Sequence, residues 1–315
     1  VGRRLGDRVH TVTTLNEPWC SAFLGHATGA HAPGLRDTAT AYRVAHHLLL
    51  GHGRAITALR AELSTDTQLS ITLNPANVRA VSASAADVRA ARIAQLATNQ
   101  VFLDPLLRGR LNADLVEVTA GETDWSFVRD GDLGVIAAPI DLLGVNYYNP
   151  HLVGASASVD GRSSPWPGVP GAWSHPQEGP STGMGWAIEP ASLTELLVEL
   201  AADYPGAPFS ITENGSAYED VVAADGSVDD RARAEYLVAH VSAVRDAIEE
   251  GVDIRAYYAW SLLDNFEWAW GLAQRFGLIH VDFDTLVRTP KTSAWVYRDI
   301  IATHGASAGG IDLAS

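Results

Sequence analysis

The chain is poor in cysteine, lysine and positive charge. Cys20 is its one cysteine among 315 residues, so no disulfide can form within it. No run of 18 apolar residues occurs, and the sequence therefore offers no membrane-spanning helix. Lysine and arginine together number 22 against 37 aspartates and glutamates, a formal net charge of -15. Nucleic acid and anionic lipid are poor candidate partners for such a chain.

The sequence also lacks the usual signals for cofactors and export. It has no G-x-G-x-x-G or P-loop pattern, which implies no nucleotide cofactor. His46, His47 and His52 share one expected helix, but no carboxylate or cysteine joins them at metal spacing, so we expect no metal and no cofactor. Cys20 carries no nucleophile signature and is interpreted as packing. No signal sequence is visible, and we expect a cytoplasmic protein. Secretion stays an alternative, because the sequence begins at Val1 and the true N-terminus is not seen.

Two stretches share an unusual ending. Phe209-Ser-Ile-Thr-Glu-Asn-Gly215 is a β-favouring run that meets a glutamate and then a turn signal. Val9-His-Thr-Val-Thr-Thr-Leu-Asn-Glu-Pro18 alternates like a strand and ends on a glutamate stopped by proline. A strand that ends on a carboxylate is how a barrel enzyme presents charge at its active face. We interpret Glu17 and Glu213 as a pair.

Strands and helices alternate along the chain. The expected strands are 9–15, 69–73, 142–147, 209–212 and 254–261. The expected helices are 38–62, 84–103 with a capping box at Ser84, one capped by Ser192-Leu-Thr-Glu195, 230–249 and 291–303. Five β–α repeats predict an α/β fold with a parallel sheet. With no linker or composition break, residues 1–315 are expected to form a single domain.

Two long connections interrupt this alternation. Residues 149–190 are rich in proline, glycine and tryptophan, and we expect a functional loop there rather than a core element. Residues 262–289 form a second expected mouth loop. Both follow predicted strands, which makes them candidates for substrate contact.

The paired glutamates indicate glycoside cleavage. That reaction uses one carboxylic acid to protonate the leaving oxygen and one carboxylate to attack or to activate water. A surface charge is the usual explanation for a single glutamate. Two glutamates at strand ends, each beside an asparagine and a turn residue, favour the catalytic interpretation.

Aromatic residues gather after the strand ends. Residues 257–270 read YYAWSLLDNFEWAW, with three tryptophans interleaved with carboxylates and an amide. Gly144-Val-Asn-Tyr-Tyr-Asn149 adds Asn146 and two phenols, and Met184-Gly-Trp186 adds another indole. Sugar rings stack their C–H faces on aromatics and hydrogen-bond carboxylates and amides. The pattern is typical of a sugar site.

TLNEP, GVNYY, MGW, ITENG and WSLLDNFEWAWG together resemble glycoside hydrolase family 1. They cover residues 9 to about 303 in family order. The resemblance implies a retaining β-glycosidase on a (β/α)8 TIM barrel, most commonly a β-glucosidase. It implies hydrolysis of terminal non-reducing β-D-glucosyl residues from β-glucosides or short β-linked oligosaccharides.

The resemblance also assigns residue roles. Glu17 would be the acid/base and Glu213 the nucleophile. Asn16 would hold the sugar 2-hydroxyl, and Tyr148 would orient the nucleophile. Trp260 would form the floor of the sugar-binding pocket, and Glu267 and Trp268 would bind the 4- and 6-hydroxyls. Phe276 would form the edge of the pocket, and Trp186 would line the leaving-group side.

The sequence departs from the family at its beginning. Members typically carry three more βα units before TLNEP, so only the last five units of the barrel are expected here. The absent part would supply an arginine beside the nucleophile and a glutamine that grips the sugar. From this we expect residues 1–315 alone to have little activity and poor solubility.

Three alternatives stay open at this point. The chain could be an inactive fragment or a non-catalytic sugar-binding remnant of the family. A 6-phospho-β-glycosidase is disfavoured because Glu267 would repel a phosphate where the family binds the 6-position. Glucosidase, galactosidase and fucosidase preferences, the leaving group and the oligomeric state are not separated by the sequence.

Overall fold

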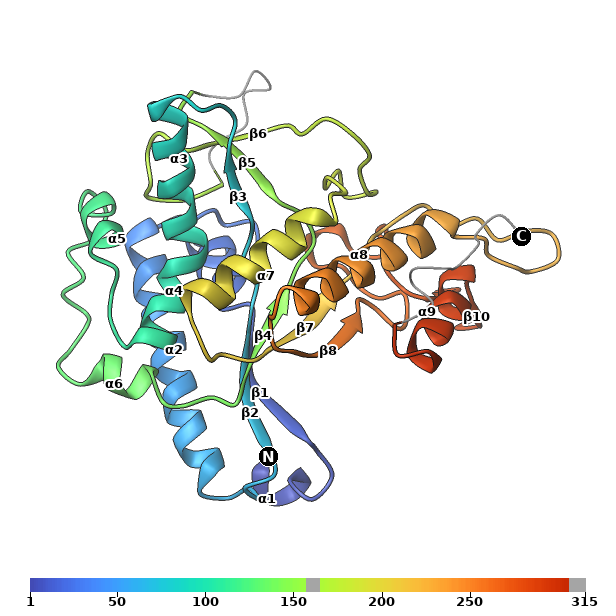
Figure 1. Cartoon of the computed structure of the whole chain (residues 1–315), viewed down its shortest axis with the longest axis horizontal. Coiled ribbons are helices and arrows are strands. Elements are labelled where there is room, and N and C mark those ends of the chain that lie inside the picture. The colour runs from blue at the N-terminus through green and yellow to red at the C-terminus, as the bar shows by residue number, and fades with distance from the viewer. Residues whose placement is uncertain (157–164, 306–315) are drawn as a thin grey trace. The chain divides into compact units, whose positions relative to one another are not determined.

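The computed structural model describes residues 1–156 and 165–305, in which strands and helices alternate (Figure 1). These residues form two compact units. Unit 1 holds Val1–Asn146, His151–Gln177 and Gly206–Phe209. Unit 2 holds Tyr147–Pro150, Glu178–Pro205 and the chain from Ser210 onward.

A five-stranded sheet has the order β1-β2-β4-β7-β8. Its strands are β1 (Thr11–Asn16), β2 (Gln68–Leu73), β4 (Leu142–Asn146), β7 (Phe209–Asn214) and β8 (Ile254–Ala259). In unit 1, β1 pairs with β2 and β2 with β4, both in parallel. All five expected strands are present, and the expected α/β class with a parallel sheet is confirmed.

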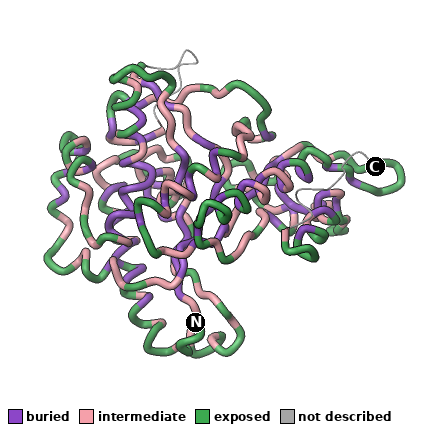
Figure 2. The backbone as a smooth tube through the Cα atoms, in the orientation of Figure 1, coloured by how far each residue is buried: buried purple, intermediate pink, exposed green. Residues whose placement is uncertain are grey.

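Burial differs from strand to strand. Every residue of β4 and five of the six residues of β2 are buried, whereas β1 and β8 contain none (Figure 2). Tyr258 of β8 is 57 % exposed. In β2 the apolar residues Leu69, Ile71 and Leu73 alternate with Ser70 and Thr72, and all five are buried, so both faces of this strand are covered.

The helices of unit 1 include α2 (Thr38–Arg60), which Asp37 caps by accepting a hydrogen bond from the Thr40 N–H. Ser84 caps α3 (Ala85–Gln95) by accepting from the Asp87 N–H at 3.1 Å, which confirms the predicted N-cap. The helical path continues beyond α3 through η2 (Leu96–Gln100), α4 (Val101–Leu103) and η3 (Asp104–Arg108). The shorter elements are α1 (Gly2–Leu5), η1 (Cys20–Leu24), α5 (Ala113–Val118) and α6 (Asp132–Ile136).

Unit 2 contains α7 (Ala191–Asp203), α8 (Arg231–Glu249) and α9 (Thr292–Ala302), and α8 packs against both other helices (Figure 1). Its shorter elements are η4 (Trp268–Trp270), β9 (Ile279–Val281) and β10 (Arg288–Pro290), with β9 and β10 antiparallel. The predicted cap at Ser192 is wrong. Pro190 is the N-cap, and Ser192 is buried inside the first turn, where its hydroxyl donates to the Glu189 carbonyl.

The connection 149–190 is not the loop without core structure that its composition suggested. Within it, β5 (His151–Gly154) pairs with β3 (Val78–Ala80) and with β6 (Trp173–His175). Trp166 is 2 % exposed, packs in a buried cluster with Val153 and α3, and donates its indole N–H to the Thr98 hydroxyl. The apolar residues of this stretch therefore build a second small core; residues 157–164 lie outside the described part of the chain.

Candidate active site

Glu17 follows the last residue of β1 in unit 1. Its backbone N–H donates to the Thr72 carbonyl of β2, and its own carbonyl accepts from the Cys20 N–H, both at 3.0 Å. These bonds hold Glu17 at a φ of 45°, in the left-handed region. That backbone costs a non-glycine residue about 1–3 kcal/mol and is found mostly where function fixes a side chain.

Both carboxylate oxygens of Glu17 have a hydrogen-bond donor. The amide of Asn146, at the end of β4, donates to Oε1 at 2.8 Å and to the Asn16 amide oxygen at 3.0 Å. The Cys20 thiol lies 3.1 Å from Oε2. The structure thus brings Asn16, Glu17 and Asn146 together at the ends of β1 and β4.

Glu213 lies one residue before the end of β7 in unit 2. The phenol of Tyr148 donates to its Oε2 at 2.7 Å, and its carbonyl accepts from the Tyr147 N–H at 2.9 Å. A charge-assisted bond of this kind fixes the orientation of an ionised carboxylate. The predicted contact between Tyr148 and the nucleophile candidate is present.

Asn214, not among the residues predicted for the site, anchors the end of β7. It is fully buried; its amide donates to the Tyr147 carbonyl and the Tyr236 hydroxyl, and its oxygen accepts from Tyr257 at 2.7 Å. Burial raises the pKa values of Tyr236 and Tyr257 well above the ordinary phenol value, so both phenols keep their protons at neutral pH. Its place in the ITENG motif was the only available signal.

Aromatic rings surround Tyr148. The ring of Trp186 lies 5.0 Å from it, and that of Phe276 lies 6.1 Å away edge-on. Phe276 is 2 % exposed, while Trp186 is half-buried. Tilted and edge-on pairs are the favoured aromatic arrangements. Trp186, Tyr148 and Phe276, predicted from three separate motifs, therefore form one cluster.

The loop after β8 carries Trp260, Glu267 and Trp268. Gly215 permits the Trp260 carbonyl to approach the end of β7, because a Cβ at Gly215 would lie 1.9 Å from that oxygen. Trp268 is 68 % exposed and, like Glu17, has a left-handed backbone, with a φ of 39°. Exposed indole rings are suited to stacking on the C–H faces of sugars.

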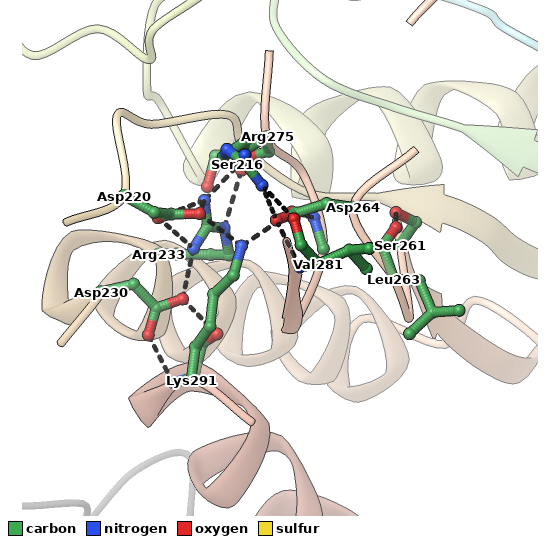
Figure 3. A network of polar contacts seen from close by, with 12 residues as sticks. Ser216, Asp220, Asp230, Arg233, Ser261, Leu263, Asp264, Arg275, Val281 and Lys291 are labelled. Atoms are coloured by element: carbon green, nitrogen blue, oxygen red, sulfur yellow. Dashed lines mark hydrogen bonds and ion pairs between the residues drawn. The ribbon is translucent and has the colours of Figure 1, made fainter. Parts of the chain in front are cut away.

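A buried ionic network lies beneath this loop (Figure 3). Lys291, fully buried, donates to Asp220 and Asp264, and Arg275 donates to Asp264 at 2.7 Å. Arg233, 1 % exposed, joins Asp220 to Asp230. Burial alone would raise the pKa of Asp264, but Lys291 and Arg275 outweigh it and hold that pKa below its usual range.

This network fixes the loop from the inside. Asp264 also accepts from the backbone N–H groups of Gly277 at 2.9 Å and Val281 at 3.2 Å. The two ends of the segment that carries Glu267 and Trp268 are therefore tied to one carboxylate. No local pattern in the sequence predicts the burial of Lys291, because burial of a single lysine depends on residues distant in the chain.

Within residues 1–156 and 165–305, no group of three histidine, cysteine or acidic residues could hold a metal ion. In the same part of the chain, no helix has the length and apolarity needed to cross a membrane. His46 contacts Asp132 at 2.9 Å, and His52 contacts the Thr14 hydroxyl at 2.6 Å. Both histidines thus have structural partners.

Glu17 directly after β1, with the Asn146 amide on it, and Glu213 near the end of β7, with the Tyr148 phenol on it, point to an α/β protein of the glycosidase type. The model of glycosyl hydrolase family 1 matches residues 1–306, and the chain belongs to this family.

Relatives agree with that assignment. The bifunctional beta-D-glucosidase/beta-D-fucosidase of Bifidobacterium breve is 48 % identical over 314 residues, which cover 97 % of this chain and 67 % of that protein. The psychrophilic beta-glucosidase BglU from Micrococcus antarcticus has a crystal structure that matches with a TM-score of 0.92 at 42 % identity, covering 95 % of this chain and 66 % of that one.

The beta-glucosidase from Thermotoga maritima in complex with deoxynojirimycin matches with a TM-score of 0.88 at 36 % identity, covering 96 % of this chain and 66 % of that one. The chain thus spans about two thirds of the length of the relatives it matches. The expected family is confirmed, and so is the expected fold class, a (β/α)8 TIM barrel of which this chain contributes five strands.

Proposed function

We propose that the protein carrying this chain hydrolyses terminal β-D-glucosyl residues by a retaining double displacement. Glu17 is the acid/base and Glu213 the nucleophile. The observation that carries the proposal is that each glutamate has its own matched donor, the Asn146 amide on Glu17 and the Tyr148 phenol on Glu213. A retaining pair needs both carboxyl groups oriented on one sugar carbon, about 5 Å apart.

The first step requires Glu213 to attack the anomeric carbon while Glu17 protonates the leaving oxygen. Tyr148 keeps Glu213 aimed. In the second step Glu17, now ionised, takes a proton from water, and this water attacks the anomeric carbon and breaks its bond to Glu213. Each step inverts the anomeric carbon, so the product keeps the original configuration. Asn16 would hold the 2-hydroxyl, where hydrogen bonds strengthen in the transition state.

The aromatic and acidic residues of unit 2 would bind the sugar. Trp260 would form the floor of the pocket, Glu267 and Trp268 would take the 4- and 6-hydroxyls, and Phe276 and Trp186 would line its sides. The names of the relatives favour β-glucosides as substrates over a non-catalytic role. A cytoplasmic location stays a prediction, testable by cell fractionation.

A covalent trap tests the assignment. A 2-fluoro-β-glucoside with a good leaving group slows breakdown of the glycosyl–enzyme, so the adduct should accumulate on Glu213. Peptide mapping locates it. A label on Glu17 or on Glu267 would mean that Glu213 is not the nucleophile. If the enzyme turns over substrate but no residue becomes labelled, the retaining mechanism is wrong.

Chemical rescue tests the other glutamate. Glu17→Ala should lose activity, and azide should restore turnover of activated glucosides by replacing the base-activated water, giving a β-glucosyl azide. A folded variant that azide fails to rescue would contradict the role of Glu17.

A further inference from the structure

The only thiol of the chain contacts the carboxylate proposed as the acid/base. Cys20 opens η1, and its Sγ lies 3.1 Å from Oε2 of Glu17. The amide of Asn74, which directly follows β2, donates to the same sulfur at 3.6 Å. Amide, thiol and carboxylate thus form a short hydrogen-bonded chain that joins the ends of two neighbouring strands.

The contact completes the orientation of Glu17. The last torsion of a glutamate is broad, so its own rotamer preference does not fix the plane of the carboxylate. The Asn146 amide donates to Oε1 and not to Oε2, so this bond by itself would still let the carboxylate plane rotate about Oε1. A second donor on Oε2 removes this freedom. Cys20 also donates its backbone N–H to the Glu17 carbonyl, so one residue fixes both ends of Glu17.

We propose that Cys20 is a positioning residue for proton transfer by Glu17, with its thiol held in turn by Asn74. The inference rests on the proposed function, since it concerns the acid/base of that reaction. A thiol is a weak donor, and its bond to an ionised carboxylate is stronger than its bond to a protonated one. The contact therefore strengthens as Glu17 gives its proton to the leaving oxygen and becomes charged.

Leaving-group dependence separates this role from simple packing. Phenyl β-glucoside needs its leaving oxygen protonated, whereas 2,4-dinitrophenyl β-glucoside does not. Cys20→Ala should lower kcat/KM for the phenyl glucoside by about 2- to 10-fold, the usual range for one hydrogen bond, and leave the dinitrophenyl glucoside within twofold. Cys20→Ser, which keeps a donor, should stay close to the unmodified enzyme.

The exposed neighbour on the same turn provides the matched control, because Ser21→Ala should change neither substrate. An equal loss on both glucosides in Cys20→Ala would overturn the proposal, as would a serine variant no better than alanine. Either result would mean that Cys20 only fills space.

A second measurement does not depend on catalysis. Alkylation of Cys20 by iodoacetamide can be followed against pH by mass spectrometry of the peptide between Arg8 and Arg36. Thiolate is the reactive form, and a neighbouring carboxylate opposes its formation. Glu17→Gln should therefore move the midpoint of the rate profile down by about one pH unit. Asn74→Ala, which removes a donor to sulfur, should move it up.

The two measurements fail in different ways. If the protein shows no glucosidase activity, the proposed function is wrong, but the alkylation profiles still test the contact between Cys20 and Glu17. If turnover is normal but the Glu17→Gln profile superimposes on that of the unchanged protein, the Cys20 contact is absent in solution and the inference is wrong.

Discussion

Glu17 and Glu213 stand at similar places on their strands but have different surroundings. Glu17 contacts an amide and a thiol, and its backbone is left-handed. Glu213 has regular strand backbone and accepts from a phenol set among aromatic rings. An amide has both a hydrogen-bond donor and an acceptor, so it can bind a carboxyl group in its ionised and in its protonated form, and an acid/base passes through both forms. A phenol donor favours the ionised form that a nucleophile needs.

Residues at similar positions in the two motifs can therefore have different structural roles. Both motifs read asparagine and glutamate at a strand end, yet the two asparagines do different work. Asn16 contacts Asn146 beside Glu17, while Asn214 points into the core and is held by three tyrosines. In unit 1 the asparagine thus lies beside the glutamate, whereas in unit 2 the asparagine anchors the strand end.

Replacing the nucleophile should give the largest effect. Glu213→Gln keeps the shape and the contact to Tyr148 but cannot form the glycosyl–enzyme, so we expect kcat to fall by at least about 10⁴-fold for every glucoside. Steady-state kinetics on phenyl and dinitrophenyl glucosides check this. A loss confined to the phenyl glucoside would exchange the roles of the two glutamates.

Glu17→Gln should produce a smaller and selective loss. General acid–base catalysis contributes about 10²–10⁴-fold, and we expect that range for phenyl β-glucoside. With dinitrophenyl β-glucoside, formation of the glycosyl–enzyme should survive and its hydrolysis should become slow, giving a burst in rapid-mixing experiments. Equal losses in both steps would contradict the distinction drawn between the two sites.

The sequence predicted the strands and the motif residues because both are local. The strand ends at Glu17 and Glu213 follow from β-favouring stretches stopped by turn residues. It could not predict the pairing of β5 with β3, which joins residues more than 70 positions apart. Burial along a helix also depends on its packing partners: Leu193, Leu196, Leu197 and Leu200 of α7 are buried, whereas the apolar Ile248 of α8 is 47 % exposed.

Polar partners were the hardest to predict. Lys291, expected only as the start of the last helix, is a buried ion-pair partner, and Cys20, interpreted as packing, contacts Glu17. Such contacts depend on which chain segments meet in three dimensions. A one-dimensional pattern carries no information about them unless a known motif contains the residue.

Lys291 allows the stability of unit 2 to be tested. Lys291→Met leaves the buried Asp220 and Asp264 without their shared cation, and breaking a buried pair costs about 3–5 kcal/mol. Denaturant unfolding should show this loss. The control is Arg3→Met in unit 1, whose pair with Glu62 is exposed and long at 3.5 Å; we expect no measurable change. Comparable effects of the two variants would mean that burial does not distinguish these pairs.

Tyr148→Phe tests how much the phenol contributes to Glu213. A hydrogen bond to a charged group is worth about 1.5–3 kcal/mol, which predicts a fall in kcat/KM of roughly 10- to 100-fold. Tyr147→Phe is the matched control, because its hydroxyl contacts buried Ser192 and not Glu213. It should alter the unfolding free energy and leave kcat/KM unchanged. A similar kinetic loss in both variants would remove the special role of Tyr148.

Acid should weaken unit 2 through His240, the smallest effect we predict. His240 is fully buried on α8, stacks on Tyr236 at 3.8 Å, faces the Tyr147 ring at 6.2 Å and donates from Nδ1 to the Tyr236 carbonyl. Burial lowers its pKa from 6.5 to about 4, against a smaller opposing contribution from that hydrogen bond.

Because the folded pKa is depressed, the unfolded chain binds the proton first as the pH falls. The stability that neutral His240 contributes is therefore present above pH 6.5 and is lost as the pH falls toward about 4. Between pH 6.5 and 5 this amounts to about 1–2 kcal/mol. His240→Phe keeps a flat ring beside Tyr236 and cannot titrate, so its unfolding free energy should fall less over that interval. Parallel curves for the two proteins would show that His240 does not carry the acid sensitivity, and would leave the buried His52 of unit 1, whose pKa is also lowered to about 4 by burial, as the group to replace next.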